Sequence, residues 1–294
     1  MKRIFIILLT CILLLCSCSE KEVEFTEVTD TAALKTYYAG ERISDWRVIA
    51  ALYLEGEEIS DYDISLYSDG TVAGDASCAI SAAILTFLFE VEGYSYSDYT
   101  PSLKAAVSNP YDVPTLDLCM ALMALYICDE KPEMLTPVMS HLAEIQLTDG
   151  GWGVDSDDMY CDPQVSAMVL NVITAYRADY ADDNSRDGLL TYLGNCIGND
   201  NTIKDGDGQS SSLATMAVLN SLIFAGIPAN GEISTALCTA IGDFSAGGTY
   251  CEYKNKTHSE EATAEVFLAF ATARRASIFT FFSDEYKEMI DQNK

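Results

Sequence analysis

The sequence predicts an all-α protein built from six helix pairs. Three observations support this fold class. Six apolar segments of similar composition recur along the chain, namely VIAAL, SAAIL, LCMAL, SAMVL, TMAVL and AEVFL. Their closing leucines are 33, 37, 48, 49 and 49 residues apart, and a near-constant step of this size is typical of repeat arrays. Amphipathic segments lie between them, so that stacked pairs can bury what a single pair cannot. We interpret the array as an α/α toroid of apolar inner and amphipathic outer helices, although an open solenoid would have the same period.

The residues at the segment boundaries place the helices. The buried inner helices are expected at 46–54, 75–89, 115–128, 162–177, 210–225 and 257–274. The outer helices are expected at 31–40, 98–107, 132–147, 185–197, 232–244 and 284–292. Asp45, Asp75 and Asp162 are predicted N-caps, because an Asp carboxylate accepts a hydrogen bond from a free backbone N–H. Thr257 and Glu260 have the spacing of a capping box.

The first residues predict a compartment. Lys2 and Arg3 precede an apolar run at 4–15 that is too short to span a bilayer. The run ends in Leu-Cys-Ser-Cys, which resembles the lipobox of bacterial lipoproteins with Cys18 as the lipidated (for example palmitate-bearing) residue. We therefore expect a signal peptide at 1–17, an acidic tether at 18–31 and the folded domain at 32–294, anchored by lipid to the extracellular face of the cell membrane. The alternative is an ordinary secretory signal that is cut elsewhere.

Charge and cysteine content limit the function. The formal net charge of −28 repels nucleic acid, which excludes that class of partner, whereas a cationic partner or a divalent ion remains compatible. Beyond Cys18 the chain has seven cysteines, at 78, 119, 128, 161, 196, 238 and 251. An odd number cannot all pair, and we expect mostly free, buried thiols. One disulfide between Cys161 and Cys251 is the alternative.

A family resemblance rests on the middle of the chain. Gln146-x-x-Asp149-Gly150-Gly151-Trp152 resembles the glutamine–tryptophan repeat of terpene cyclases, and DPQVSAMVL at 162–170 resembles a repeat helix of the prenyltransferase and squalene cyclase superfamily. The resemblance implies an α/α toroid over about 32–294. It is closest to secreted, surface-type repeat proteins of Gram-positive bacteria, and cobalamin carriers are more distant relatives. It supports a fold better than an activity.

Three motifs suggest chemistry. The first is Asp155-Ser156-Asp157-Asp158, which matches the acid string of squalene-type cyclases but precedes the expected helix start, so we expect a solvated loop. The second is a zinc set of Asp158, Cys161 or Asp162, and His258, implied by protein prenyltransferases of this fold. The third is calcium at Asp205-Gly-Asp-Gly-Gln, where an EF-hand would need Glu in place of Met216. We expect no resident cofactor, with zinc and calcium as weaker alternatives.

A ligand site is expected where the inner-helix ends and their loops converge. Aromatic and polar groups around a concavity make a binding site, and the candidate residues are Trp46, Trp152, Tyr160, Asp162, Tyr250 and His258. Trp152 and Tyr250 have an alternative role as structural wedges. The sequence thus predicts a non-enzymatic surface lipoprotein that binds a small ligand or a surface protein. The alternatives are a corrinoid or other nutrient binder, and a degenerate or active cyclase- or prenyltransferase-type enzyme.

Overall fold

The computed structural model describes residues 25–67, 70–133, 135–177, 183–254 and 256–283. The chain is mostly helical over these residues, which confirms the all-α class. The strands that it describes form two short antiparallel hairpins, in which β1 (Ile203–Lys204) pairs with β2 (Ser210–Ser211) and β3 (Ser245–Ala246) pairs with β4 (Thr249–Tyr250).

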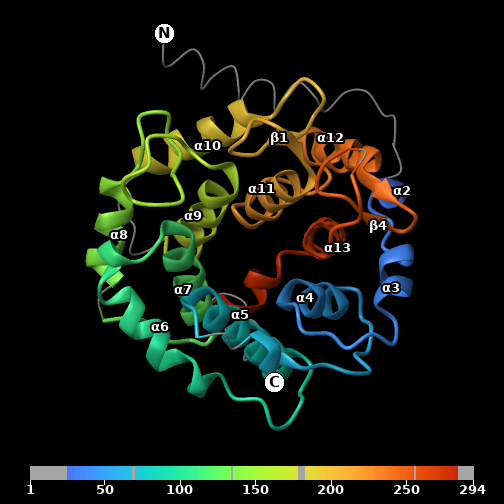
Figure 1. Cartoon of the computed structure of the whole chain (residues 1–294), viewed down its shortest axis with the longest axis horizontal. Helices are drawn as coiled ribbons and strands as arrows, with labels where there is room; N and C mark the ends of the chain where they lie inside the picture. Colours follow the sequence, from blue (N-terminus) through green and yellow to red (C-terminus); the bar gives the residue numbers. More distant parts are fainter. Residues whose placement is uncertain (1–24, 68–69, 134, 178–182, 255, 284–294) are drawn as a thin grey trace.

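Six apolar helices correspond to the segments expected to be buried. They are α4 (Trp46–Leu54), α5 (Val72–Ala83, continued by the π-turn Ile84–Leu88), α7 (Thr115–Ile127), α9 (Pro163–Ala175), α11 (Ser212–Phe224) and α13 (Glu260–Arg274). In chain order each packs on the next, and α13 packs on α4. The order of contacts is therefore closed, and Figure 1 shows the six helices around a common centre.

A second set of helices lies outside the first in Figure 1. It consists of α3 (Ala32–Tyr38), α6 (Thr100–Val107), α8 (Leu135–Glu144), α10 (Asp183–Cys196) and α12 (Glu232–Ala240). Among them, α6 packs on α7, α10 on α9 and α12 on α11. The outer helix expected at 284–292 lies outside the described residues.

Two of the predicted N-caps, Asp45 and Asp162, are confirmed. Asp45 accepts from the backbone N–H of Arg47, and Asp162 accepts from those of Gln164 and Val165 at 2.8 and 3.0 Å. The prediction for Asp75 was wrong. The helix α5 begins earlier, capped by Thr71, and the Asp75 carboxylate instead accepts from Ser102 at 2.6 Å.

The expected capping box before α13 is also absent. The helix begins at Glu260, and its N-cap is Ser259, which accepts from the backbone N–H of Ala262. Glu260 cannot reach back as an N3 residue because it is the first helical residue, and its carboxylate contacts Tyr37 and His258.

Trp152 fixes the turn between α8 and α9. Its side chain is fully buried, and its indole N–H donates to the carbonyl of Leu142 at 2.7 Å. Its backbone N–H donates to Ser166 Oγ at 2.9 Å. The preceding Gly150 has φ +94° and lies so close to the backbone of Gly188 that a Cβ would clash. Trp152 is therefore a wedge that joins an outer helix to the start of an inner one.

The centre of the helix ring is occupied by the chain's own 3₁₀ segment η6 (Ile278–Phe282). Phe279 contacts Trp46 of α4 and Phe224 of α11, and η6 also packs on α7. These three helices are not neighbours in the closed order of contacts, so a segment that contacts all three lies near the axis. Figure 1 shows it as the red segment that crosses the middle after α13.

The region assigned to the tether is partly folded. Residues Phe25–Val28 form the short helix α2, which contacts α12, and Thr29 and Thr31 are buried. Thr31 Oγ1 donates to Glu55 Oε2 at 2.7 Å. The packed domain therefore begins before Ala32.

The signal peptide expected at 1–17 and the lipidation site Cys18 lie outside the described residues. Within the described ranges, no helix combines the length and apolarity that crossing a bilayer requires.

The wedge role of Trp152 gives a stability prediction. Trp152→Phe leaves the Leu142 carbonyl without its donor and should lower the free energy of unfolding by about 1–3 kcal/mol. Trp152→Ala also leaves a cavity and should cost about 3–5 kcal/mol. Urea denaturation followed by circular dichroism measures both. Trp46→Phe is the matched control, because the Trp46 indole makes no hydrogen bond with the described residues. A Trp152→Phe variant no less stable than Trp46→Phe would refute the wedge role.

Candidate functional site

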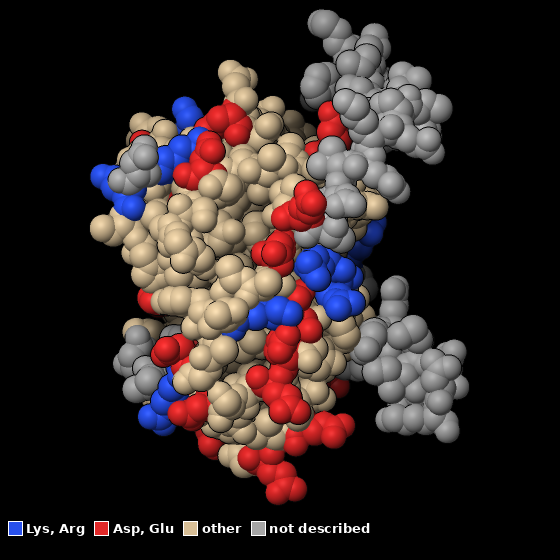
Figure 2. All heavy atoms as spheres, turned by 90° about the vertical axis from the view of Figure 1, so that its right-hand side faces the viewer, with Lys and Arg blue, Asp and Glu red and all other residues tan. Residues whose placement is uncertain are grey.

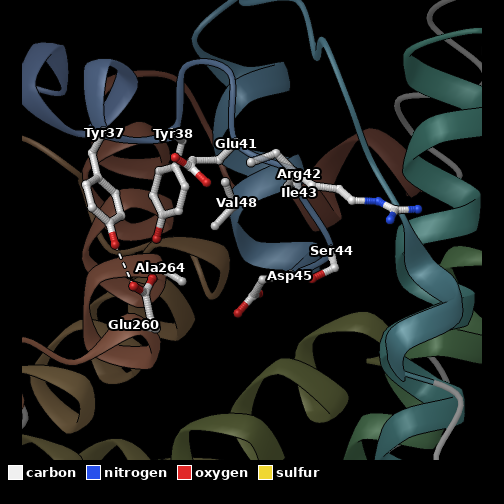
Figure 3. A pocket seen from close by; sticks show the side chains of 10 residues that line it. All are labelled: Tyr37, Tyr38, Glu41, Arg42, Ile43, Ser44, Asp45, Val48, Glu260 and Ala264. Carbon is white, nitrogen blue, oxygen red and sulfur yellow. Dashed lines mark hydrogen bonds between the residues drawn. The ribbon is translucent and has the colours of Figure 1, made fainter.

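A cavity of about 410 Å³ lies between the end of α3, the connection to α4, and the first turns of α4 and α13. We call it the α3–α4–α13 pocket (Figure 3). It is lined by Tyr37, Tyr38, Glu41, Arg42, Ile43, Ser44, Asp45, Val48, Glu260 and Ala264. The residues come from opposite ends of the described chain, and they meet because the last inner helix, α13, packs on the first, α4.

Local structure sets the shape of this pocket. The helix α3 ends at Tyr38, whose ring stacks on Phe267 of α13 with ring centroids 5.7 Å apart. Gly40 then turns the chain with φ +82°, a backbone conformation that glycine adopts without strain. Ile43 is buried and pairs with Tyr62 through a backbone bridge. The two tyrosines therefore project into the pocket from a fixed helix end.

The charges in the pocket are mainly negative. Figure 3 shows the carboxylates of Glu41, Asp45 and Glu260 around it, while the side chain of Arg42 extends away from the tyrosines. Arg42 pairs with Asp63 at 2.5 Å. Acidic side chains also cover much of the lower part of the molecular face that carries α2 and α3 (Figure 2). The pocket thus combines two phenol rings with carboxylates, and its lining arginine is turned to another partner.

Tyr37, His258 and Glu260 form a cluster at the rim of the pocket. Tyr37 donates its hydroxyl proton to Glu260 Oε1 at 2.5 Å, and His258 Nε2 lies 2.7 Å from the same oxygen. The Tyr37 oxygen and His258 Nε2 are 3.3 Å apart. The hydrogen bond to Glu260, with burial and the nearby Glu41, raises the pKa of Tyr37 to about 12. Burial opposes ionisation of Glu260, but the hydrogen bonds from Tyr37 and His258 outweigh it and lower the pKa of this carboxyl.

Behind the pocket, a buried ion network joins three inner helices. Arg47 of α4 contacts Asp45 at 2.7 Å and Glu265 of α13 at 3.4 Å. Asn220 of α11 donates to the other oxygen of Glu265 at 2.6 Å. Burial raises the pKa of Glu265, and the charge of Arg47 opposes this shift only in part. The network positions Asp45, which both caps α4 and lines the pocket.

The ligand-site residues expected from the sequence separate into three groups. His258 lies at the rim cluster. Trp46, Trp152 and Tyr250 are structural: Trp46 is buried against Phe279, and Tyr250 contacts Phe270 edge-on with ring centroids 6.1 Å apart. They do not line the pocket, because each packs between helices.

The other two expected residues, Tyr160 and Asp162, lie elsewhere. Tyr160 is 81 % exposed and lines a second, more open cavity of about 490 Å³. Cys161 lines the same cavity, opposite Tyr192 and Cys196 of α10. The carboxylate of Asp162 serves as the N-cap of α9.

The expected zinc ligands are not brought together. Asp158 closes its own loop by accepting from the backbone N–H of Asp155 at 2.9 Å, whereas Cys161 lies in the second cavity and His258 beside Tyr37. Across the part of the chain that the structure describes, no group of three His, Cys, Asp or Glu side chains has metal-binding geometry. A set chosen for its places in the sequence therefore does not converge in space.

The acidic motifs lie in turns. Asp155 and Asp157 are exposed and precede α9, as expected for a solvated loop. Asp205, at the start of the expected calcium motif, accepts from the backbone N–H groups of Asp207 and Gln209 and from the hydroxyl of Tyr253 at 2.7 Å. These hydrogen bonds use both of its carboxylate oxygens to hold the turn.

A further sequence expectation concerns the cysteines. Cys161 and Cys251 are both free, and Cys251 Sγ donates to the carbonyl of Lys256 at 2.9 Å. His141 of α8 is 3 % exposed and packs edge-on against Tyr111. Burial lowers the pKa of His141.

Sequence reasoning missed most of the pocket. Tyr37 and Glu41 carry no motif, and the partners of Tyr37, His258 and Glu260, are more than 200 residues away. The signals that could have found them are the paired tyrosines at the end of an outer helix and the glutamates that follow the loop histidine. Neither has a spacing that points to a ligand.

The network behind the pocket gives a pH prediction. Folding raises the pKa of Glu265, so the folded state binds the carboxyl proton of this residue more tightly than the unfolded chain does. The contribution of Glu265 to stability is therefore fully present below its ordinary pKa of 4.5 and is lost as pH rises through the folded value. The stability of Glu265→Gln relative to wild type should rise between about pH 4.5 and pH 7. The matched control is Glu261→Gln, whose side chain also faces Arg47 but is 64 % exposed. Urea titrations over this range measure the stability difference, and a flat Glu265→Gln curve would contradict the assignment.

Comparisons with known proteins add no family. No family model matches the chain, and no match was found among the curated proteins or the solved structures.

Proposed function

We propose that this chain is a lipid-anchored binding protein, displayed outside the cell membrane, whose helices form an α/α toroid of six pairs. The closed order of contacts from α4 through α13 supports the toroid, as does the 48–49 residue step between the later repeats. The sequence at 1–18, with its charged start, apolar run and Cys18, supports the lipid anchor. In this proposal the array of helices is the scaffold, and function lies at a pocket on it.

The α3–α4–α13 pocket is the proposed ligand site, and the ligand carries an ammonium or guanidinium group. The observation that carries this proposal is the convergence of Glu41, Asp45 and Glu260 with the rings of Tyr37 and Tyr38. A cation gains from nearby carboxylates and from the faces of aromatic rings. The volume of about 410 Å³ is in the range of small-molecule sites. The net charge of −28 would also attract a cation from a distance.

The alternatives have less support. A cyclase or prenyltransferase needs an open apolar interior, whereas Phe279 and Phe282 of η6 are buried at the centre of the ring. The acid string at 155–158 lies in a mostly exposed loop. A corrinoid is a bulky macrocycle, and the polar α3–α4–α13 pocket suits a smaller, cationic ligand. An absorbance titration with cobalamin tests that alternative directly.

The proposed ligand class can be tested with spermidine as the probe and 1,8-octanediol as an uncharged probe of similar length. Isothermal titration should show spermidine binding to the wild-type protein and no binding of the diol. Glu41→Gln should weaken spermidine binding by at least about tenfold, because a charge-assisted contact is worth roughly 1.5–3 kcal/mol. Glu133→Gln, which changes the net charge equally at an exposed site before α8, is the matched control. Equal affinities in the two variants would show that the pocket is not the binding site.

The lipid anchor can be tested separately. Cys18→Ser should abolish incorporation of labelled palmitate and shift the protein from the membrane fraction to the soluble fraction, because the acyl chains attach at that thiol. Cys16→Ser, in the same segment, is the control and should keep the label. Labelled Cys18→Ser protein in the membrane fraction would refute Cys18 as the anchor.

A further inference from the structure

We propose that Tyr37, His258 and Glu260 form a site for a ferric ion at the rim of the α3–α4–α13 pocket. Their donor atoms, the Tyr37 oxygen, His258 Nε2 and Glu260 Oε1, are 2.5, 2.7 and 3.3 Å apart. A single metal ion can contact all three at bond lengths of about 2.0–2.2 Å. The three atoms come from α3, the loop before α13 and the first turn of α13, and the fold brings them close together.

Hydrogen bonds on both sides of the imidazole hold the ring of His258. Thr263 Oγ1 donates its proton to the carbonyl of Ser259 at 2.7 Å and accepts from the backbone N–H of Tyr250 at 3.0 Å. Its remaining lone pair faces His258 Nδ1 at 3.4 Å. Nε2 lies 2.7 Å from Glu260 Oε1 and donates to it. A bound ion would take the place of this proton, and the neutral imidazole would then donate from Nδ1 to Thr263 Oγ1.

The surroundings hold the histidine as a metal ligand requires. Metal-binding histidines donate their second ring N–H to a nearby acceptor, which fixes the ring orientation, and Thr263 is placed for this role. The backbone of His258 is also held by a bridge to Cys251. The side chains of His258 and Glu260 are 34 % and 69 % exposed, so that an ion and its remaining water ligands have access.

The donor set favours iron in the ferric state. Imidazole binds iron, zinc, copper and nickel, whereas a phenolate oxygen and a carboxylate are hard, anionic donors that suit a trivalent ion. Binding replaces the Tyr37 O–H bond with an oxygen–iron bond and releases one proton to solvent, with no change in oxidation state. A bound cation makes this deprotonation favourable. Phenolate and carboxylate offset two of the three positive charges, and solvent fills the open positions.

The phenolate gives the test a specific signal, because its charge-transfer band to ferric iron lies in the visible region. Purified full-length protein in detergent is titrated with ferric nitrilotriacetate, and bound iron is measured in parallel. Wild type should bind one equivalent and develop the band. Tyr37→Phe should lose it, and Tyr38→Phe, which changes the adjacent tyrosine outside the cluster, should keep it. His258→Ala should keep the band but bind iron more weakly. Circular dichroism checks that each variant is folded.

Iron uptake without a visible band, or a band that survives in folded Tyr37→Phe, would overturn the site. Spermidine titrations of the same variants separate this inference from the proposed function. His258 does not line the pocket, so His258→Ala should retain spermidine affinity while losing iron affinity. Protein that binds iron but not spermidine would refute only the amine site, and the converse would refute only the iron site.

Discussion

The structure depends on the burial of six apolar helices that no single helix pair can accomplish. Each inner helix is apolar over most of its circumference, so it needs a neighbour on both sides as well as an outer helix behind it. An open array would leave α4 and α13 with exposed apolar flanks. Their mutual packing removes these flanks, and the aromatic segment η6 fills the remaining space near the axis.

Closure also explains where the polar groups are. The contact between α4 and α13 joins the first and last inner helices, and the buried network of Arg47, Glu265 and Asn220 lies across the helices at this seam. Burying such charges is costly unless they are paired and hydrogen-bonded. The α3–α4–α13 pocket lies at the same seam. The Arg47–Glu265 pair and the pocket thus both lie where the ends of the described domain meet.

Local interactions were predictable and distant ones were not. Asp162 caps α9 because the residues that it binds follow it directly, and the glycine turn places Trp152 against α8 only ten residues away. Asp75 fails as a cap because Thr71 is also a good capping residue and starts the helix earlier. Glu260 fails as a capping-box residue because tertiary partners, Tyr37 and His258, occupy its carboxylate. A capping residue decides a helix end only when no better-placed cap nearby and no distant partner competes with it.

The sequence by itself determined the helical class, the positions of the expected helices that the structure describes to within a few residues, and the repeat step, because these follow from apolar periodicity and from contacts within a turn. Only the tertiary structure decided that the zinc candidates stay apart, that the interior is filled by Ile278–Phe282, and that Tyr37 meets His258 across the chain. The physical reason is distance along the chain. A side chain's partner more than 200 residues away leaves no local pattern, and it becomes a neighbour only when the last inner helix packs against the first.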